Sequence, residues 1–207
     1  MNDTGLDGPR EVGSNVCSVM AEPRSTIDLL RAETATHHDG LESGLRIEDR
    51  LSGSETRGPL IAGYFAFHRK TEAALSPHLR DMPDLAFASR VQARHVKNDS
   101  SCGTLLGNLV FPEIGTKAEA LGAFYVLEGS SLGGKKILKT LRSRGVSTDD
   151  LHFLNPYGKD ARARWQTFLE VFERETAHNR STMNACVSGA IKAFAFAATC
   201  LREERTN

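Results

Sequence analysis

Apolar residues recur at intervals of three and four along most of this chain, which is the spacing that gathers them on one side of an α-helix. No segment shows sustained alternation of Val, Ile and Thr, and no Asn-Gly or Asp-Gly turn joins two such runs. A chain of 207 residues has enough apolar material for one domain with a real core. The sequence therefore predicts an all-α, single-domain helix bundle over residues 23–207, preceded by a polar segment, residues 1–22, that we expect to be disordered.

Capping patterns predict where the first helices begin. Ser25, followed three residues later by Asp28, is typical of a helix N-cap, and the apolar pattern then predicts a helix to about Gly44. Proline is suited to the first turn of a helix, so Pro59 predicts the start of a second helix, which we expect to end before Pro77.

The clearest helix is predicted to follow Thr116. Thr116 and Glu119 form a capping box, and basic residues before Gly145 are a normal stop signal. A short helix and then a loop are expected over residues 82–101, a turn at 155–158, and two further helices over 160–180 and 182–204.

Composition restricts the class of protein. The 26 basic and 26 acidic residues cancel, so the chain has no electrostatic reason to bind nucleic acid or an anionic membrane surface. The four cysteines lack the spacing of a zinc site. No stretch reaches the roughly 18 apolar residues of a membrane span, and the N-terminus lacks the apolar region of a signal peptide. We expect a cytoplasmic protein with reduced thiols, no nucleic-acid partner and no membrane span.

Two adjacent histidines, His37 and His38, lie on the first predicted helix. They fall on opposite edges of its apolar stripe, so either could face a buried pocket, and both would suit an exposed helix surface. A metal-ligating imidazole usually donates from its second nitrogen to an acceptor. Glu42 lies one turn after His38 and could be that acceptor, whereas His37 has only Leu41 at that spacing. Chemistry thus favours His38, although periodicity does not choose between the two.

The helix predicted after Thr116 carries four interior glycines. Gly122, Gly129 and Gly133 share one face, and Gly134 follows directly. Each costs about 0.5–1 kcal/mol relative to alanine in a helix, so something must compensate. A face without side chains allows a flat ligand to reach the backbone, or allows a second helix to pack closely. The sequence leaves both alternatives open.

A histidine backed by a carboxylate and a bare helix face together suit a planar metal macrocycle, which needs an axial ligand on one side and a thin slot on the other. The propionates of such a ring are anionic, and Arg31, two turns before His38, is a candidate partner. Four cations of the glycine helix are further candidates, although we expect them to form a solvated face: Lys135, Lys136, Lys139 and Arg142.

The segments that hold these residues resemble haem oxygenases. Leu30–Glu42 follows the pattern L-R-x-x-T-x-x-x-H-x-x-L-E of the family's proximal helix. Gly122–Gly134 is similar to G-x-x-Y-V-L-E-G-S-x-L-G-G, the distal helix of the bacteriophytochrome-associated, biliverdin-producing bacterial members. The spacing Tyr64-x-x-x-His68-x-x-x-Glu72 fits the family's second helix.

The C-terminal third of the chain is similar to the family only in being helical. Four of its aromatic residues are candidates for pocket or core: Trp165, Phe168, Phe194 and Phe196. Propionate contacts from this half are expected at Lys159, Arg162 or Arg164.

The resemblance implies an activity and its site. Haem would be both substrate and cofactor, cleaved with O₂ and electrons from an external reductase or ferredoxin to biliverdin, CO and iron, and a bacteriophytochrome would receive the biliverdin. In this register His38 ligates the iron, Glu42 orients it and Arg31 contacts a propionate. The other residues implied are Tyr125 and Gly134 as haem contacts, and Gly129, Ser130 and Gly133 as the catalytic distal face.

Ser130 departs from the animal members of the family, which carry an aspartate there that organises a water molecule. A hydroxyl can hold a water but is not an anionic anchor. The phytochrome-linked members tend to have serine at this position, so the resemblance still implies turnover.

Two other functions remain open on the sequence. A haem-binding sensor or carrier on the same fold would keep His38 and the glycine face without turnover. A haem-free helical protein, such as a small-molecule hydrolase or an adaptor, would carry His38 as a surface residue.

Overall fold

The computed structural model describes residues 25–93, 109–176 and 179–202, and within these ranges the chain is helical with no β-strand. The expectation of an all-α fold is confirmed. The helices, in chain order, are α1 (Thr26–Leu45), α2 (Ile47–Ser52), α3 (Ser54–Leu79), the 3₁₀ turn η1 (Pro83–Leu85), α4 (Phe87–Arg90), α6 (Lys117–Ser143), the 3₁₀ turns η3 (His152–Leu154) and η4 (Gly158–Asp160), α7 (Ala161–Thr176) and α8 (Arg180–Leu201). The polar segment 1–22 and the loop expected near residue 98 lie outside the described residues.

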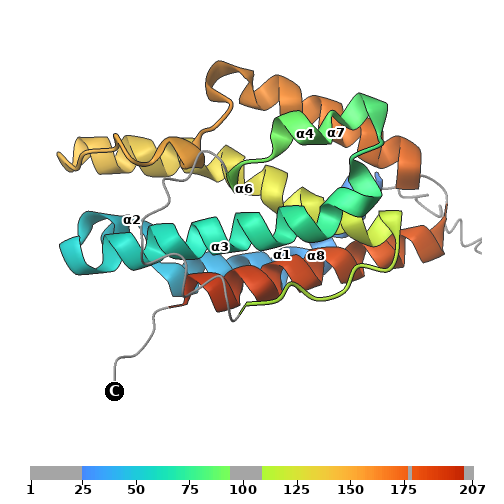
Figure 1. The fold of residues 1–207 in the computed structure, drawn as a ribbon, viewed down its shortest axis with the longest axis horizontal. Coiled ribbons are helices and arrows are strands. Elements are labelled where there is room, and N and C mark those ends of the chain that lie inside the picture. Colours follow the sequence, from blue (N-terminus) through green and yellow to red (C-terminus); the bar gives the residue numbers. More distant parts are fainter. Residues whose placement is uncertain (1–24, 94–108, 177–178, 203–207) are drawn as a thin grey trace, which may run out of the picture.

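The bundle is built around α6 and α8. These two helices have the most extensive contact in the structure, and α8 also packs on α1 and α3. In Figure 1, α8 (red), α1 (blue) and α3 (teal) lie along one side, α6 (yellow) crosses them, and α4 (green) and α7 (orange) cover the other side of α6. The core between these layers contains the fully buried rings of Phe124, Phe168 and Phe172.

Two helices begin where their capping residues predict. The Ser25 side chain accepts a hydrogen bond from the Asp28 backbone N–H, and the Thr116 side chain accepts one from the Glu119 N–H. The Glu119 carboxylate reaches back to the N–H of Gly115, one residue before the N-cap. Gly145 follows the end of α6 with a φ of +74°, the left-handed conformation that a glycine adopts without strain.

The second helix differs from its prediction at both ends. It begins at Ser54 rather than near Pro59 and continues to Leu79, so that Pro59 and Pro77 both lie inside α3. Each proline removes the hydrogen bond to the carbonyl four residues earlier, and its ring crowds that carbonyl. Both prolines are exposed, and so are Glu55 and Ala73, whose carbonyls lose the partner, so water can replace it.

Helix α8 is long and apolar enough, by composition, to cross a membrane. Half of its apolar stretch is buried inside the protein, and it packs against α1, α3 and α6. These contacts make α8 the central core helix of the bundle.

Candidate functional site

A cavity of about 360 Å³ lies where α1, α3, α6, α7 and α8 meet. This volume is within the range of roughly 300–1,000 Å³ that is usual for small-molecule pockets. The residues predicted for the site converge here from separate helices: Arg31, His38 and Glu42 from α1, and Tyr125, Gly129, Ser130 and Gly133 from α6. A wider groove of about 1,210 Å³ between α1, α7 and α8 contains none of them.

The two adjacent histidines of α1 face different hollows. His38 lines the same cavity as Gly129 and Gly133. His37 lines a separate shallow groove with Gly40 and Gly44. Tertiary structure therefore makes the choice that helical periodicity leaves open, and it places His38 on the same cavity as the glycine face.

Both ring nitrogens of His38 lie near carboxylates. Nε2 is 3.6 Å from Glu42 Oε1, and Nδ1 is 3.5 Å from Asp39 Oδ1. The ring also lies edge-on to Phe194 of α8, with 6.0 Å between the ring centroids. The side chain is 51% exposed, so the imidazole can bind a ligand through one nitrogen while a carboxylate accepts a hydrogen bond from the other.

The glycines of α6 are not equivalent. An added Cβ at Gly129 or Gly133 would have nothing within 4 Å, so both border open space. At Gly122 the Cβ would lie 1.8 Å from the carbonyl oxygen of Cys186, and at Gly134 it would lie 1.7 Å from that of Leu154. Gly122 and Gly134 are therefore sites of close backbone packing.

Gly134 is consequently not part of the cavity, unlike the other predicted site residues. The resemblance places it beside the ligand, but the structure packs it against the η3 turn. The sequence Gly133-Gly134 does not show which of the two glycines is packed tightly. That depends on the path of the chain after α6, which brings Leu154 against Gly134.

Arg31 and Tyr125 lie at one edge of the cavity. Arg31 Nη1 is 3.3 Å from Asp28 Oδ1, and the guanidinium is half exposed. Burial raises the pKa of Tyr125, and the nearby Arg31 partly opposes this effect. This edge therefore offers a cation and a neutral hydroxyl to an anionic group on a ligand.

Ser130 directs its hydroxyl hydrogen at its own helix. Its Oγ donates to the Leu127 carbonyl over 2.7 Å, although the residue lines the cavity. A hydroxyl that donates in this way still has lone pairs to accept a hydrogen bond. Toward the cavity, Ser130 thus acts as an acceptor.

Aromatic side chains complete the cavity walls. Trp165 and Phe194 line it, whereas Phe168 and Phe196 are buried in the core. Tyr64 and Phe67 of α3 also line it. The sequence reasoning did not assign these two to the pocket, although Tyr64 begins the pattern Tyr64-x-x-x-His68-x-x-x-Glu72.

The other two residues of that pattern lie away from the cavity. His68 Nδ1 is 3.6 Å from Glu72 Oε1, and both side chains are buried. The Glu72 carboxylate accepts hydrogen bonds from the backbone N–H groups of Gln92 and Ala93. This pair therefore ties α3 to the segment after α4.

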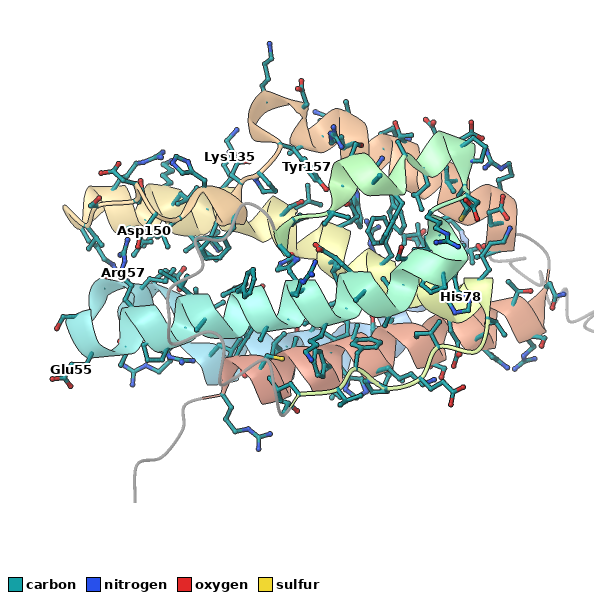
Figure 2. All side chains as sticks on the ribbon, viewed as in Figure 1. Glu55, Arg57, His78, Lys135, Asp150 and Tyr157 are labelled. Atoms are coloured by element: carbon teal, nitrogen blue, oxygen red, sulfur yellow. The ribbon has the colours of Figure 1, made fainter. Side chains whose placement is uncertain are left out.

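The three cations expected to reach the site from the C-terminal half do not line the cavity. Arg164 donates to Ser89 Oγ over 3.1 Å, and its guanidinium lies over the ring of Tyr157. The cations of α6 form the exposed face that was expected, and Figure 2 shows Lys135 pointing away from the bundle.

The cavity suits a flat, metal-bearing ring in three respects. It has an accessible imidazole from α1, two glycines of α6 that border open space, and aromatic side chains from α3, α7 and α8. Arg31 supplies positive charge at the edge. No bulky side chain occupies the space at Gly129 and Gly133, and His38, although half exposed, lines the cavity.

Comparisons with known proteins agree on one family. Residues 111–203 match the heme oxygenase family model. A heme oxygenase of Xanthomonas campestris pv. campestris (strain 8004) is 34% identical over 94 residues, which are 45% of this chain and 56% of that protein. The chain thus spans about half the length of this curated relative.

The fold is also shared with a solved structure. The NO- and CO-bound heme oxygenase from Neisseria meningitidis matches with a TM-score of 0.67 over 86% of this chain and 91% of that one, at 19% identity. This match shows the fold alone. Residues 111–203, which include α6, α7 and α8, are thus similar to the heme oxygenase family, and the chain shares the fold of a heme oxygenase.

Proposed function

We propose that this protein is a haem oxygenase that binds haem in the cavity between α1 and α6 and cleaves it oxidatively to biliverdin, CO and iron. The observation that carries the proposal is that His38 and the open backbone at Gly129 and Gly133 face one cavity from two different helices. The imidazole and the open space at these two glycines would accommodate a planar ring and a small ligand.

Each wall of the cavity has a role in this proposal. His38 would hold the iron, and Glu42 would accept a hydrogen bond from the imidazole and fix its orientation. Arg31 and Tyr125 would face a propionate, since they offer a cation and a hydroxyl at one edge of the cavity. Tyr64, Phe67 and the other aromatic residues would exclude water from the ring.

The glycine face would contribute open space rather than a side chain. Without side chains at Gly129 and Gly133, this part of the cavity would leave room for a small ligand beside the ring. Ser130 would accept a hydrogen bond from a water molecule, because its own proton is engaged by the Leu127 carbonyl. That water would supply the protons of the reaction, and no side chain would act as a nucleophile.

The reaction needs partners that we infer from the chemistry. Haem supplies the redox-active iron when bound, O₂ is the oxidant, and a reductase or ferredoxin would supply the electrons. We propose the cytoplasm as the location and, from the similarity of Gly122–Gly134 to the phytochrome-linked pattern, a bacteriophytochrome as receiver of the biliverdin.

A titration with hemin followed by reduction in air tests the proposal. We expect a roughly 1:1 complex with a sharp Soret band, which on reduction in air is lost as the broad red band of biliverdin appears. A stable spectrum after reduction would instead indicate a sensor or carrier. Absence of a Soret complex would contradict haem binding altogether.

A pair of histidine variants tests the ligand. His38→Ala should abolish or severely weaken axial ligation with the fold intact, while His37→Ala, the matched control on the other groove, should leave it unchanged. The opposite result would show that the assignment of the ligand is wrong.

A further inference from the structure

A buried group of three polar side chains, Arg90, Glu128 and Tyr157, lies beside the glycine face but outside the cavity. The side chains of Arg90 and Glu128 are 3% and 1% exposed, and Arg90 Nη1 donates to Glu128 Oε2 over 2.6 Å. Tyr157 donates its hydroxyl hydrogen to Glu128 Oε1 over 2.7 Å. Both oxygens of this carboxylate are therefore held, and none of the three residues touches the proposed haem site.

The partners of Glu128 are themselves fixed to the backbone. Arg90 Nε donates to the Leu85 carbonyl over 2.7 Å, and its Nη2 donates to the Arg164 carbonyl over 3.0 Å. Tyr157 reaches toward α4 and α6 from the turn before α7, as Figure 2 shows. The group thus joins α6 to α4 and to the start of α7.

Glu128 directly precedes the open turn Gly129–Gly133 of α6. On the far side of this turn, Gly134 is packed against the Leu154 carbonyl of η3. Between these two fixed points, a Cβ at either end of the turn would meet nothing within 4 Å.

The open turn has reasons to be deformable. The hydroxyls of Ser130 and Ser131 donate to the carbonyls of Leu127 and Glu128, three residues earlier, and such bonds bend helices. Glycine also permits bending within a helix. A turn of this kind needs an external support if its position is to be fixed.

We propose that Glu128, held by Arg90 and Tyr157, is a positioning residue that fixes the height of the open turn Gly129–Gly133 above His38, and so limits how thick a ligand the haem complex accepts on its glycine side. This inference rests on the proposed haem binding, because the slot is defined by the ring.

The chemistry of the group supports a positional role. A buried ion pair contributes little stability compared with apolar side chains of the same size. Its hydrogen bonds are directional, however, and apolar contacts would allow α6 to slide where these bonds do not. Glu128 has two such bonds on one carboxylate, at the residue next to the open turn.

The test uses two exogenous ligands of different thickness, cyanide and imidazole, on the ferric hemin complex of the full chain. The measured quantity is the ratio of their dissociation constants, obtained by titration of the Soret band. Tyr157→Phe removes one hydrogen bond to Glu128, and it should shift the ratio toward imidazole by roughly five-fold, the change that one such bond supports. Arg90→Met combined with Glu128→Leu removes both buried charges together and should shift it by about ten-fold or more.

A second ion pair provides the control. Arg57 and Asp150 form a partly buried pair at the end of the bundle away from Tyr157, visible in Figure 2. Arg57→Met with Asp150→Leu should lower stability and leave the ligand ratio unchanged. An equal shift in this control would overturn the inference, because general loosening would then explain the effect.

The outcomes separate this inference from the proposed function. If the unaltered protein fails to form a His38-dependent hemin complex, the proposed function is wrong and the positioning role falls with it. If the complex forms and the ratio is unchanged in Tyr157→Phe, only the positioning role is wrong. Tyr157→Phe keeps its ring and leaves no buried charge unpaired, so it provides this answer even if the double variant does not fold.

Discussion

The two ends of the glycine stretch in α6 differ from its middle. At Gly122 and Gly134 the backbone of another segment lies so close that a methyl group would overlap it. At Gly129 and Gly133 a methyl group would meet nothing within 4 Å. The same residue type thus brings helices together at two positions and leaves a slot open at two others. The spacing of small residues does not reveal which use a glycine serves.

The largest effect is expected where the packing is tightest. Gly122→Ala would place a Cβ 1.8 Å from the Cys186 carbonyl oxygen, where backbone rather than a flexible side chain must move. We expect the free energy of unfolding to fall by about 3 kcal/mol or more, measured by urea denaturation. A variant as stable as the parent would show that α6 and α8 do not cross as described.

A bulky side chain in the open middle should affect binding and spare the fold. Gly129→Leu is expected to weaken hemin binding roughly 5- to 150-fold, the equivalent of an overpacking of about 1–3 kcal/mol. Hemin titration and circular dichroism measure the two effects. Gly58→Leu is the control, because Gly58 is an equally open helical glycine away from the cavity. Unchanged hemin affinity in Gly129→Leu would show that the space beside Gly129 is not part of the hemin site.

The N-terminal end of α6, near the tightly packed Gly122, also depends on the carboxylate of Glu119, whose protonation changes with pH. Burial of Glu119, the largest single influence, favours its neutral form, but Lys192 and the Gly115 N–H outweigh it and lower the pKa below its usual value of 4.5. A lowered pKa means that the contribution to stability is present above pH 4.5 and is lost as the pH falls through the folded-state value.

Glu119→Gln should therefore lower the free energy of unfolding by about 1 kcal/mol at neutral pH, the worth of one such hydrogen bond. The difference from the parent protein should shrink below pH 4.5. Urea denaturation at several pH values measures this. A difference that grows on acidification would contradict the sign of the shift.

The smallest effect is expected from the mildest change in the open middle. Gly129→Ala adds a methyl group that meets nothing and removes the flexibility of a helical glycine. We expect the free energy of unfolding to rise by about 0.5–1 kcal/mol, seen as a higher Tm. A loss of stability as large as that of Gly122→Ala would abolish the distinction between the two kinds of glycine.

Much of the fold could be read from local patterns. The starts of α1 and α6, at Ser25 and Thr116, follow from caps whose hydrogen bonds join residues three apart. The stop at Gly145 follows from a backbone conformation that glycine adopts easily. The start of α3 could not be read in this way, because the packing of α3 in the bundle outweighs the cost of a proline inside the helix.

The sequence by itself determined the helices and the chemistry that they carry: His38 with Glu42 one turn later, and the glycines of α6. Only the tertiary structure decided that His38 rather than His37 lines the same cavity as Gly129 and Gly133, and that Gly134 packs against Leu154 instead. The physical reason is how far apart in the chain the interacting residues lie. Helix starts and faces depend on bonds and spacings of three or four residues, whereas a cavity depends on where helices far apart in the chain cross.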